Sequence, residues 1–317
     1  MTDDVNKELE DEFQQRNETL RGFYNTDALA MSDEEVASLT PILNALTDRV
    51  ARYHEIQKIA EGGEKKITLV HDHRLDRRVA MARAAHAKTP RDQEQFLREA
   101  RLTANLAHPN IMPVYNMGID QQGIPFFSME LVPGDSLKTI IKNLREGKDS
   151  YKRDYPLDTL LNIFIKICDA IAFAHSRNVL HLDIKPDNIR VGDFGEVLVC
   201  DWGLARVMNT PEEVSGEESD VLDADVLNDM TLSGTMKGTP GFMAPEQTQA
   251  YEEKTAQTGV YALGAVLYML LTHELPGSGD SENGVIQNTR GGKVSPPRGR
   301  TPGQHNPPGL ASGDLKG

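Results

Sequence analysis

The chain of 317 residues carries 34 Lys and Arg against 48 Asp and Glu, which gives a net charge of −14. A balance this acidic argues against nucleic acid or an anionic membrane as the main partner. Cys168 and Cys200 lie in apolar stretches, so we expect them to pack in a core and the protein to be cytoplasmic. The acidic N-terminus lacks the apolar run of a signal peptide, and the most apolar stretch, residues 259–272, is shorter than the ~20 residues that a membrane span needs.

Residues 1–52 form a polar, helix-compatible extension. Residues 32–35, Ser-Asp-Glu-Glu, have the form of a capping box, because the Glu35 side chain can reach back to the Ser32 amide. Apolar residues then recur at helical spacing, interrupted by Pro41; they are Val36, Leu39, Leu43 and Leu46. We predict an extension that is packed on the next domain or partly mobile, and the alternative is a regulatory or docking segment.

Two pairs of short strands are predicted after the extension. Residues 67–70 and 78–81 are β-like runs on either side of a turn at residues 73–76. Residues 114–118 and 124–130 form the second pair.

A glycine pair precedes the first of these strands. Gly62 and Gly63 are followed within three residues by Lys65 and Lys66. A glycine pair alone is most typical of a hairpin turn. Its position just before a strand also fits a loop that cradles phosphate.

Helices are predicted at residues 91–107 and 156–178. In the first helix, Glu99 shares a face with Phe96 and Leu102. A carboxylate among apolar neighbours needs a cation or water, so Glu99 is a candidate for an ion pair, although an exposed Glu at the edge of the apolar face is the alternative.

The strongest chemical signal lies at residues 181–188, His-Leu-Asp-Ile-Lys-Pro-Asp-Asn, followed by Asp201 after an apolar strand. Phosphoryl transfer needs one carboxylate to orient a hydroxyl and oxygen ligands to hold Mg²⁺ on the phosphates. Asp183 would orient the hydroxyl, Asn188 and Asp201 would bind the metal, and Lys185 could reach the transferring phosphate. Two surface turns rich in Asp and Asn are the alternative.

This stretch resembles the catalytic loop and the metal-binding loop of protein kinases, H-R-D-x-K-x-x-N and D-F-G, the latter reading D-W-G at residues 201–203. Residues 238–246 resemble G-T-x-x-Y-M-A-P-E, the segment that positions the substrate peptide. Residues 259–264 resemble D-V-Y-A-L-G, the start of a central helix. The chain is thus similar to bacterial Ser/Thr protein kinases over roughly residues 53–300.

The resemblance implies an α+β, bilobal fold. A small lobe at residues 53–132 would hold an antiparallel β-sheet, and a mostly helical, incomplete large lobe would follow at 133–275. Residues 1–52 would be the helical, acidic extension, and 276–317, rich in Pro, Gly and Ser, are expected to be loop-like or disordered.

One family residue is missing. Residues 79–82 resemble the V-A-I-K strand, with Ala82 in place of the phosphate-binding lysine. The chain resembles the with-no-lysine kinases, in which a lysine in the glycine-rich loop replaces it. Lys65 matches that position, Lys66 is a second candidate, and Glu99 would pair with the relocated ammonium.

The family pattern also implies an ATP site. The glycine-rich loop would be degraded but retain Gly62 and Gly63, next to Lys65 and Lys66. A gatekeeper, two backbone contacts to adenine and a contact to the ribose are implied at Met129, Glu130, Val132 and Asp135.

Three further departures carry expectations. Leu182 replaces the arginine that usually binds a phosphate on the activation loop, so we expect weak or no dependence on phosphorylation of the acidic loop at residues 204–243. Gly259 replaces an aspartate that hydrogen-bonds the catalytic loop, so a looser loop is expected. The arginine that usually pairs with the residue matched by Glu246 is missing.

The predicted function is transfer of the ATP γ-phosphate, with Mg²⁺, to serine or threonine hydroxyls of protein substrates. Lys185 and Thr239 favour Ser/Thr over Tyr in the family pattern. The alternative is a catalytically inactive pseudokinase that binds nucleotide or a partner, which Ala82 and Gly259 favour. No nucleic acid partner and no membrane segment are expected.

Overall fold

The computed structural model describes residues 52–62, 65–85, 87, 89–208, 238–249, 252–277, 279 and 281–294. Gly63, nearly all of the predicted extension and most of the predicted activation loop lie outside the described residues.

The chain divides into two compact units, residues 1–54 with 71–77 and residues 55–70 with 78–317. In the first unit, the Arg52 guanidinium lies 2.8 Å from the buried carboxylate of Asp72. The second unit contains every predicted site residue.

A five-stranded sheet has the order β1-β2-β3-β5-β4. Its strands are β1 (Tyr53–Glu61), β2 (Lys65–Asp72), β3 (Arg77–Ala84), β4 (Val114–Ile119) and β5 (Pro125–Met129). Both predicted strand pairs are confirmed. The turn between β4 and β5 follows from its residues, because Asp120 Oδ1 accepts from the amides of Gln122 and Ile124, and Gly123 adopts a φ of +81°.

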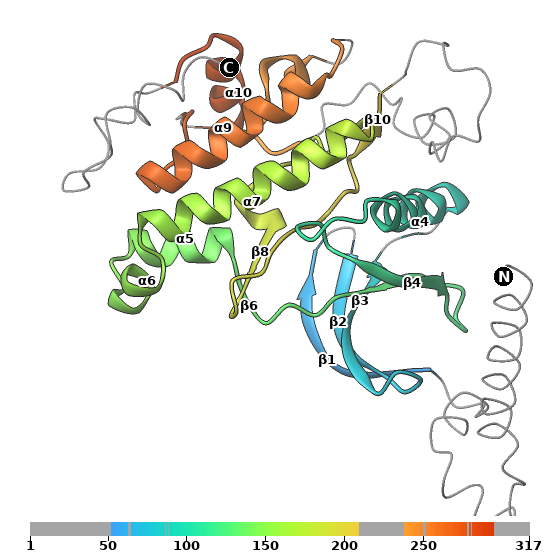
Figure 1. Cartoon of the computed structure of the whole chain (residues 1–317). Coiled ribbons are helices and arrows are strands. Elements are labelled where there is room, and N and C mark those ends of the chain that lie inside the picture. Colours follow the sequence, from blue (N-terminus) through green and yellow to red (C-terminus); the bar gives the residue numbers. More distant parts are fainter. Residues whose placement is uncertain are drawn as a thin grey trace, which may run out of the picture. The chain divides into compact units, whose positions relative to one another are not determined.

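Helix α4 (Pro90–Asn105) packs against β4 and β5, as Figure 1 shows. The sequence Thr-Pro-Arg-Asp starts it. Thr89 Oγ1 accepts from the Asp92 amide at 3.2 Å, and the Asp92 carboxylate accepts from the Thr89 amide at 3.0 Å, a reciprocal capping arrangement. The helix predicted at residues 91–107 is therefore confirmed.

The chain after β5 is mostly helical, with short strands between the helices. The helices are α5 (Leu137–Arg145), α6 (Asp149–Asp154), α7 (Leu157–Ser176), α9 (Ala256–Thr272) and α10 (Glu282–Arg290), with 3₁₀ turns η1 (Pro186–Asn188) and η3 (Pro245–Thr248). The strands are β6 (Gly134–Ser136), β7 (Val179–Leu180), β8 (Ile189–Gly192), β9 (Val197–Val199) and β10 (Arg206–Val207). Strand β8 pairs with both β6 and β9, and β10 pairs with β7.

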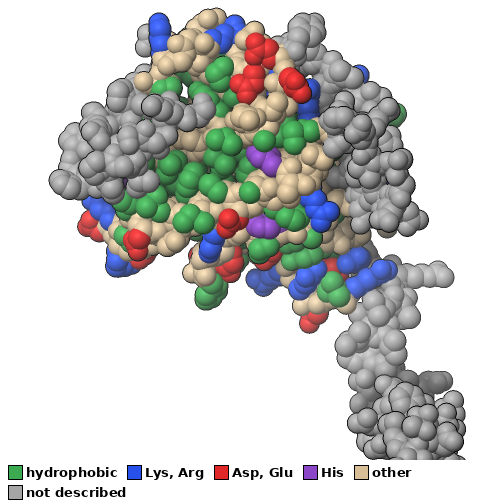
Figure 2. All heavy atoms as spheres, turned by 45° about the horizontal axis from the view of Figure 1, so that its top comes forward, with side chains coloured by type: hydrophobic (Ala, Val, Ile, Leu, Met, Phe, Trp, Pro, Cys, Tyr) green, Lys and Arg blue, Asp and Glu red, His purple; other side chains and the backbone are tan. Residues whose placement is uncertain are grey.

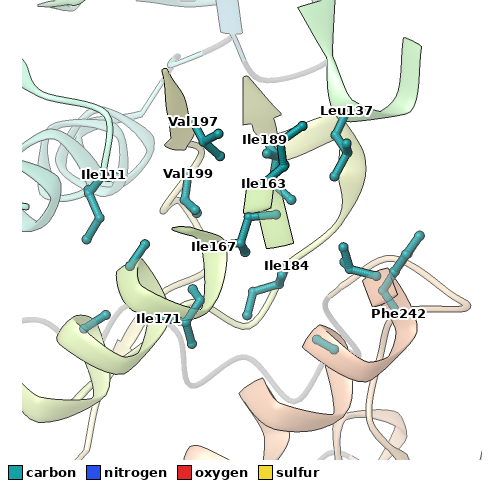
Figure 3. Packing of buried hydrophobic residues seen from close by; sticks show 14 of the residues in the cluster. Ile111, Leu137, Ile163, Ile167, Ile171, Ile184, Ile189, Val197, Val199 and Phe242 are labelled. Atoms are coloured by element: carbon teal, nitrogen blue, oxygen red, sulfur yellow. The ribbon is translucent and has the colours of Figure 1, made fainter. Parts of the chain in front are cut away.

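The core beneath the predicted catalytic loop is built on α7 (Figure 3). The helix predicted at 156–178 is confirmed, and its buried stripe packs with residues of β8 and β9. The residues in this cluster that Figure 3 labels on these elements are Ile163, Ile167, Ile171, Ile189, Val197 and Val199. The catalytic loop, which joins β7 to β8, is thus anchored at both ends in one hydrophobic cluster.

The prediction that residues 276–317 are loop-like is wrong at residues 282–290, which form α10. Ser281 Oγ caps the helix by accepting from the Gly284 amide at 3.2 Å, and Ile286 is buried. At the end of α10, Arg290 Nε donates to Thr248 Oγ1 at 2.8 Å, so this helix is tied to η3. A short cap and one buried apolar residue were too weak a signal among the prolines and glycines that follow.

The surface of the helical part is locally apolar. Helix α9 is apolar on most sides, and most of its positions are buried, but Val260 is 50% exposed and Ile165 of α7 is 55% exposed. Figure 2 shows apolar side chains gathered in the middle of the visible face. In the described parts of the chain, no helix combines the length and the apolar character that crossing a membrane requires.

The space beside Gly259 of α9, where a side chain would lie, is already occupied. A Cβ added there would lie 2.7 Å from the imidazole of His175 on α7. Burial lowers the pKa of His175, and its Nε2 has no hydrogen-bond partner among the described residues. The ring therefore fills, in a neutral form, the space that a side chain at position 259 would need.

This contact predicts opposite effects for two identical substitutions in α9. Gly259→Ala gains helix propensity but forces the His175 ring to move, so we expect a net loss of about 1 kcal/mol of stability. Gly264→Ala meets no atom within 4 Å and should gain about 0.5–1 kcal/mol. Urea unfolding of both variants measures the difference, and equal stability of the two would contradict a tight contact at position 259.

Candidate active site

The predicted catalytic loop brings its polar side chains together around Asp183. Lys185 Nζ donates to Asp183 Oδ2 at 2.7 Å, and Thr239 Oγ1 donates to Asp183 Oδ1 at 2.8 Å. Lys185 Nζ also donates to Thr239 Oγ1 at 2.7 Å, which closes a three-membered network. The network links the loop to the segment that resembles G-T-x-x-Y-M-A-P-E, far away in sequence.

Asn188 lies on the same side of the loop as Asp183. Its Nδ2 donates to the Asp183 carbonyl at 3.0 Å and to Asp183 Oδ2 at 3.2 Å. Because both bonds use the amide nitrogen, the amide oxygen is left as a potential ligand for a cation. Asn188 is buried within η1, so its position is fixed by the backbone of the turn.

Asp201 follows β9 and has a φ of +65°, in the left-handed region that is uncommon for residues other than glycine. The next residue, Trp202, is fully buried, with its ring 4.5 Å from the ring of His181. Trp202 Nε1 donates to the Val199 carbonyl at 3.4 Å. The buried indole thus fixes the turn from which the Asp201 carboxylate projects.

The ammonium of Lys65 lies between two carboxylates. Its Nζ is 2.6 Å from Glu99 Oε1 and 2.5 Å from Asp201 Oδ1. Although burial opposes the charged form, the two carboxylates raise the pKa of Lys65 well above its usual range. Burial would raise the pKa of Asp201, but the nearby Lys65 ammonium holds it below its ordinary value. Lys65 and Asp201 are therefore both charged at neutral pH.

Ala82 of β3 is fully buried and packs in an apolar cluster with Phe96, Ala100 and Phe127. The side chain that reaches Glu99 comes instead from the start of β2. Gly203 completes the arrangement, because a Cβ at that position would lie 3.2 Å from Glu99 Oε2. Sequence reasoning missed this close approach, which only the fold reveals.

Lys66 is not brought to this cluster. Successive side chains of a strand point to opposite faces, and Lys66 Nζ lies 3.3 Å from Glu55 Oε1 in an exposed pair. Gly62, which follows β1, donates its amide to the carbonyl of Lys65, the first residue of β2, at 2.8 Å.

The linker after β5 carries the residues that the resemblance assigns to adenine. Met129 packs against an apolar cluster of Met112, Val132 and Leu198. The Glu130 amide donates to the Pro113 carbonyl at 3.2 Å. Among the described residues, no hydrogen bond engages the Glu130 carbonyl or the Val132 amide, which leaves one acceptor and one donor along this edge.

Two linker contacts were not predicted. Arg190 of β8 donates from Nη2 to the carbonyls of Val132, at 3.3 Å, and of Gly134. The Tyr151 hydroxyl, from α6, donates to Asp135 Oδ2 at 2.6 Å, so a ribose would compete with Tyr151 for that carboxylate. Neither Arg190 nor Tyr151 had a signal in the sequence, since both act through residues distant in the chain.

The donor set fits Mg²⁺. Asn188 and Asp201 offer oxygen atoms, the ligands that Mg²⁺ prefers, and this ion commonly uses one or two carboxylates together with phosphate oxygens. No group of three or more His, Cys, Asp or Glu side chains that could hold a metal occurs in the described residues.

The comparisons with known proteins identify the family and agree with the fold. A family model for the protein kinase domain matches residues 53–300. The chain therefore belongs to the protein kinase family, and the α+β, bilobal fold is confirmed.

Among curated proteins, the chain is similar to serine/threonine-protein kinase PknD of Protochlamydia amoebophila (strain UWE25), with 38% identity over 234 residues, 71% of this chain and 23% of that protein. It is 37% identical to PknD of Chlamydia pneumoniae over 237 residues, 71% of this chain and 24% of the relative. With PknD of Chlamydia trachomatis serovar D it shares 34% identity over 282 residues, 84% of this chain and 29% of the relative. The chain thus spans about a quarter of the length of these relatives.

The ion pairs predict a large difference between two neighbouring lysines. Lys65→Met leaves the buried Glu99 carboxylate without its cation, so we expect a loss of about 3 kcal/mol of stability. Lys66→Met removes only an exposed pair and should cost less than about 1 kcal/mol. Urea unfolding measures both, and similar losses in the two variants would argue against a structural ion pair at Lys65.

Proposed function

We propose that this chain transfers the γ-phosphate of ATP to serine or threonine hydroxyls of proteins. The observation that carries the proposal is the contact of the Lys65 ammonium with both Glu99 and Asp201. A cation there can serve the role of the lysine that is missing at Ala82. The names of the PknD relatives support the same reaction class.

Asp183 orients the substrate hydroxyl. Its carboxylate is held by Thr239 and Lys185, so it points in one direction before substrate arrives. Lys185 carries a positive charge beside this carboxylate and neutralises charge on the transferring phosphate. Thr239 joins the substrate-positioning segment to the same network, which favours a serine or threonine substrate.

Asn188 and Asp201 hold Mg²⁺. When bound, Mg²⁺ would supply positive charge that offsets the charge of the phosphates. The Lys65 ammonium occupies one oxygen of Asp201 in the structure, so this carboxylate is already paired with a cation. Glu99 keeps Lys65 near the phosphates, and Lys65 provides a second positive charge to them.

The nucleotide base and sugar bind along the linker. The Glu130 carbonyl and the Val132 amide contact the adenine edge, Met129 lies behind the base, and Asp135 contacts the ribose. The turn that begins at Gly62 and the ammonium of Lys65 cover the phosphates, whereas Lys66 pairs with Glu55 on the other face of β2 and takes no part. Arg190 supports the linker by donating to the Val132 carbonyl.

Phosphate transfer from radiolabelled ATP to a generic basic protein tests the proposal. Asp183→Asn should lower kcat by on the order of 10²–10⁴-fold, because the hydroxyl loses its oriented carboxylate. Lys65→Met should lower it by on the order of 10²–10³-fold, whereas Lys66→Met should stay near the wild-type rate. Nucleotide binding by the wild type without any transfer would favour the inactive pseudokinase alternative.

We also predict that turnover depends weakly or not at all on phosphorylation of the loop at residues 204–243. Leu182 has no positive charge with which to bind a phosphate, so dephosphorylation removes no interaction at this position. Treatment with a Ser/Thr phosphatase should leave the initial rate within about twofold of a mock-treated sample, because no contact between a phosphate and residue 182 exists to be removed. A rate drop of an order of magnitude would contradict this expectation.

A further inference from the structure

Leu182, the residue before Asp183, has a strained backbone. Its φ is +62°, in the left-handed region, which is unfavourable for a branched side chain. Such a conformation persists only where the surrounding structure holds it. The peptide that joins Leu182 to Asp183 is bound at both ends, because the Asp183 amide donates to His181 Nδ1 at 3.2 Å and the Leu182 carbonyl accepts from Gln247 Nε2 at 2.8 Å.

Gln247 is well suited to hold this carbonyl. It lies in η3 and is only 6% exposed. The side-chain Oε1 of Gln247 accepts from the backbone amide of Ala244 at 3.0 Å, and the backbone amide of Gln247 donates to the Ala244 carbonyl at 3.0 Å. Reversing the side-chain amide would oppose oxygen to the Leu182 carbonyl and nitrogen to the Ala244 amide. The amide therefore has a single favourable orientation.

No side chain at position 259 shares this task, because Gly259 has none and the His175 ring occupies the adjoining space. The segment at residues 238–249 instead supports Asp183 through two hydrogen bonds. Thr239 binds its carboxylate, and Gln247 binds the peptide that precedes it. The expectation of a loose loop was based on Gly259 alone and did not include this second support.

We propose that Gln247 is a positioning residue for phosphoryl transfer: it holds the strained Leu182 peptide and thereby sets the direction of the Asp183 carboxylate. This role rests on the proposed function of Asp183. A small displacement of an oriented catalytic group can cost on the order of 10²-fold in rate. Loss of Gln247 should therefore lower kcat at least tenfold and leave KM for ATP within about twofold, since the linker residues lie elsewhere.

Gln247→Met tests this inference with Gln249→Met as the matched control. Gln249 lies two residues away and is exposed, so the same substitution there should change neither parameter. Methionine keeps the length of the side chain but removes both hydrogen bonds without burying a charge. A kcat for Gln247→Met within twofold of the control would overturn the proposal.

Gln247→Glu separates hydrogen bonding from simple filling of space. Burial raises the pKa of a carboxyl group, and the protonated form regains a donor for the Leu182 carbonyl. We expect kcat, relative to the wild type, to rise as the pH falls from 8 to 6, with no such trend for Gln247→Met. A flat ratio for Gln247→Glu would contradict a role as hydrogen-bond donor.

Hydrogen exchange distinguishes failure of this inference from failure of the proposed function. If the wild type transfers no phosphate, the proposed function fails, but the amides of residues 179–190 can still be compared between Gln247→Met and Gln249→Met by mass spectrometry. Faster exchange in the first variant supports positioning of the loop by Gln247. Equal exchange in both overturns it, whatever the rate of transfer.

Discussion

The arrangement of the site depends on one electrostatic constraint: a buried carboxylate must have a cation. Glu99 lies on an apolar face of α4, where an unpaired charge would be costly. Lys65 satisfies it and contacts Asp201 with the same ammonium. This single group therefore couples the β-sheet, helix α4 and the loop after β9. Ala82 of β3 packs in an apolar cluster and supplies no cation. The cation for Glu99 therefore comes from Lys65 on β2.

A second set of contacts fixes the catalytic loop. The loop leaves a hydrophobic cluster through β7 and returns to it through β8, so its ends are rigid, while its centre contains the strained Leu182. The segment near η3 supports this centre through Thr239 and Gln247. Helix α10 in turn binds η3 through Arg290. Support for Asp183 thus extends from the loop to the last helix that the structure describes.

Local chemistry made much of this predictable. The two strand pairs, the helices at α4 and α7, and the meeting of Lys65 with Glu99 followed from periodicity and from the resemblance of motifs. Helix α10 was missed because its cap and its one buried residue, Ile286, stand within a stretch rich in Pro and Gly. Lys65 and Lys66 could not be separated beforehand, because their difference depends on which face of β2 each one occupies.

The sequence by itself determined the family, the identity of the polar groups and their order, because motif residues keep fixed spacings along a loop. Only the tertiary structure decided which groups meet. Gln247 reaches Leu182, and Arg190 reaches the linker, across 65 and 58 positions of the chain. Such contacts have no local pattern, since they depend on how strands pair and helices pack rather than on neighbouring residues. For the same reason His175, not a side chain at Gly259, came to fill the space between α7 and α9.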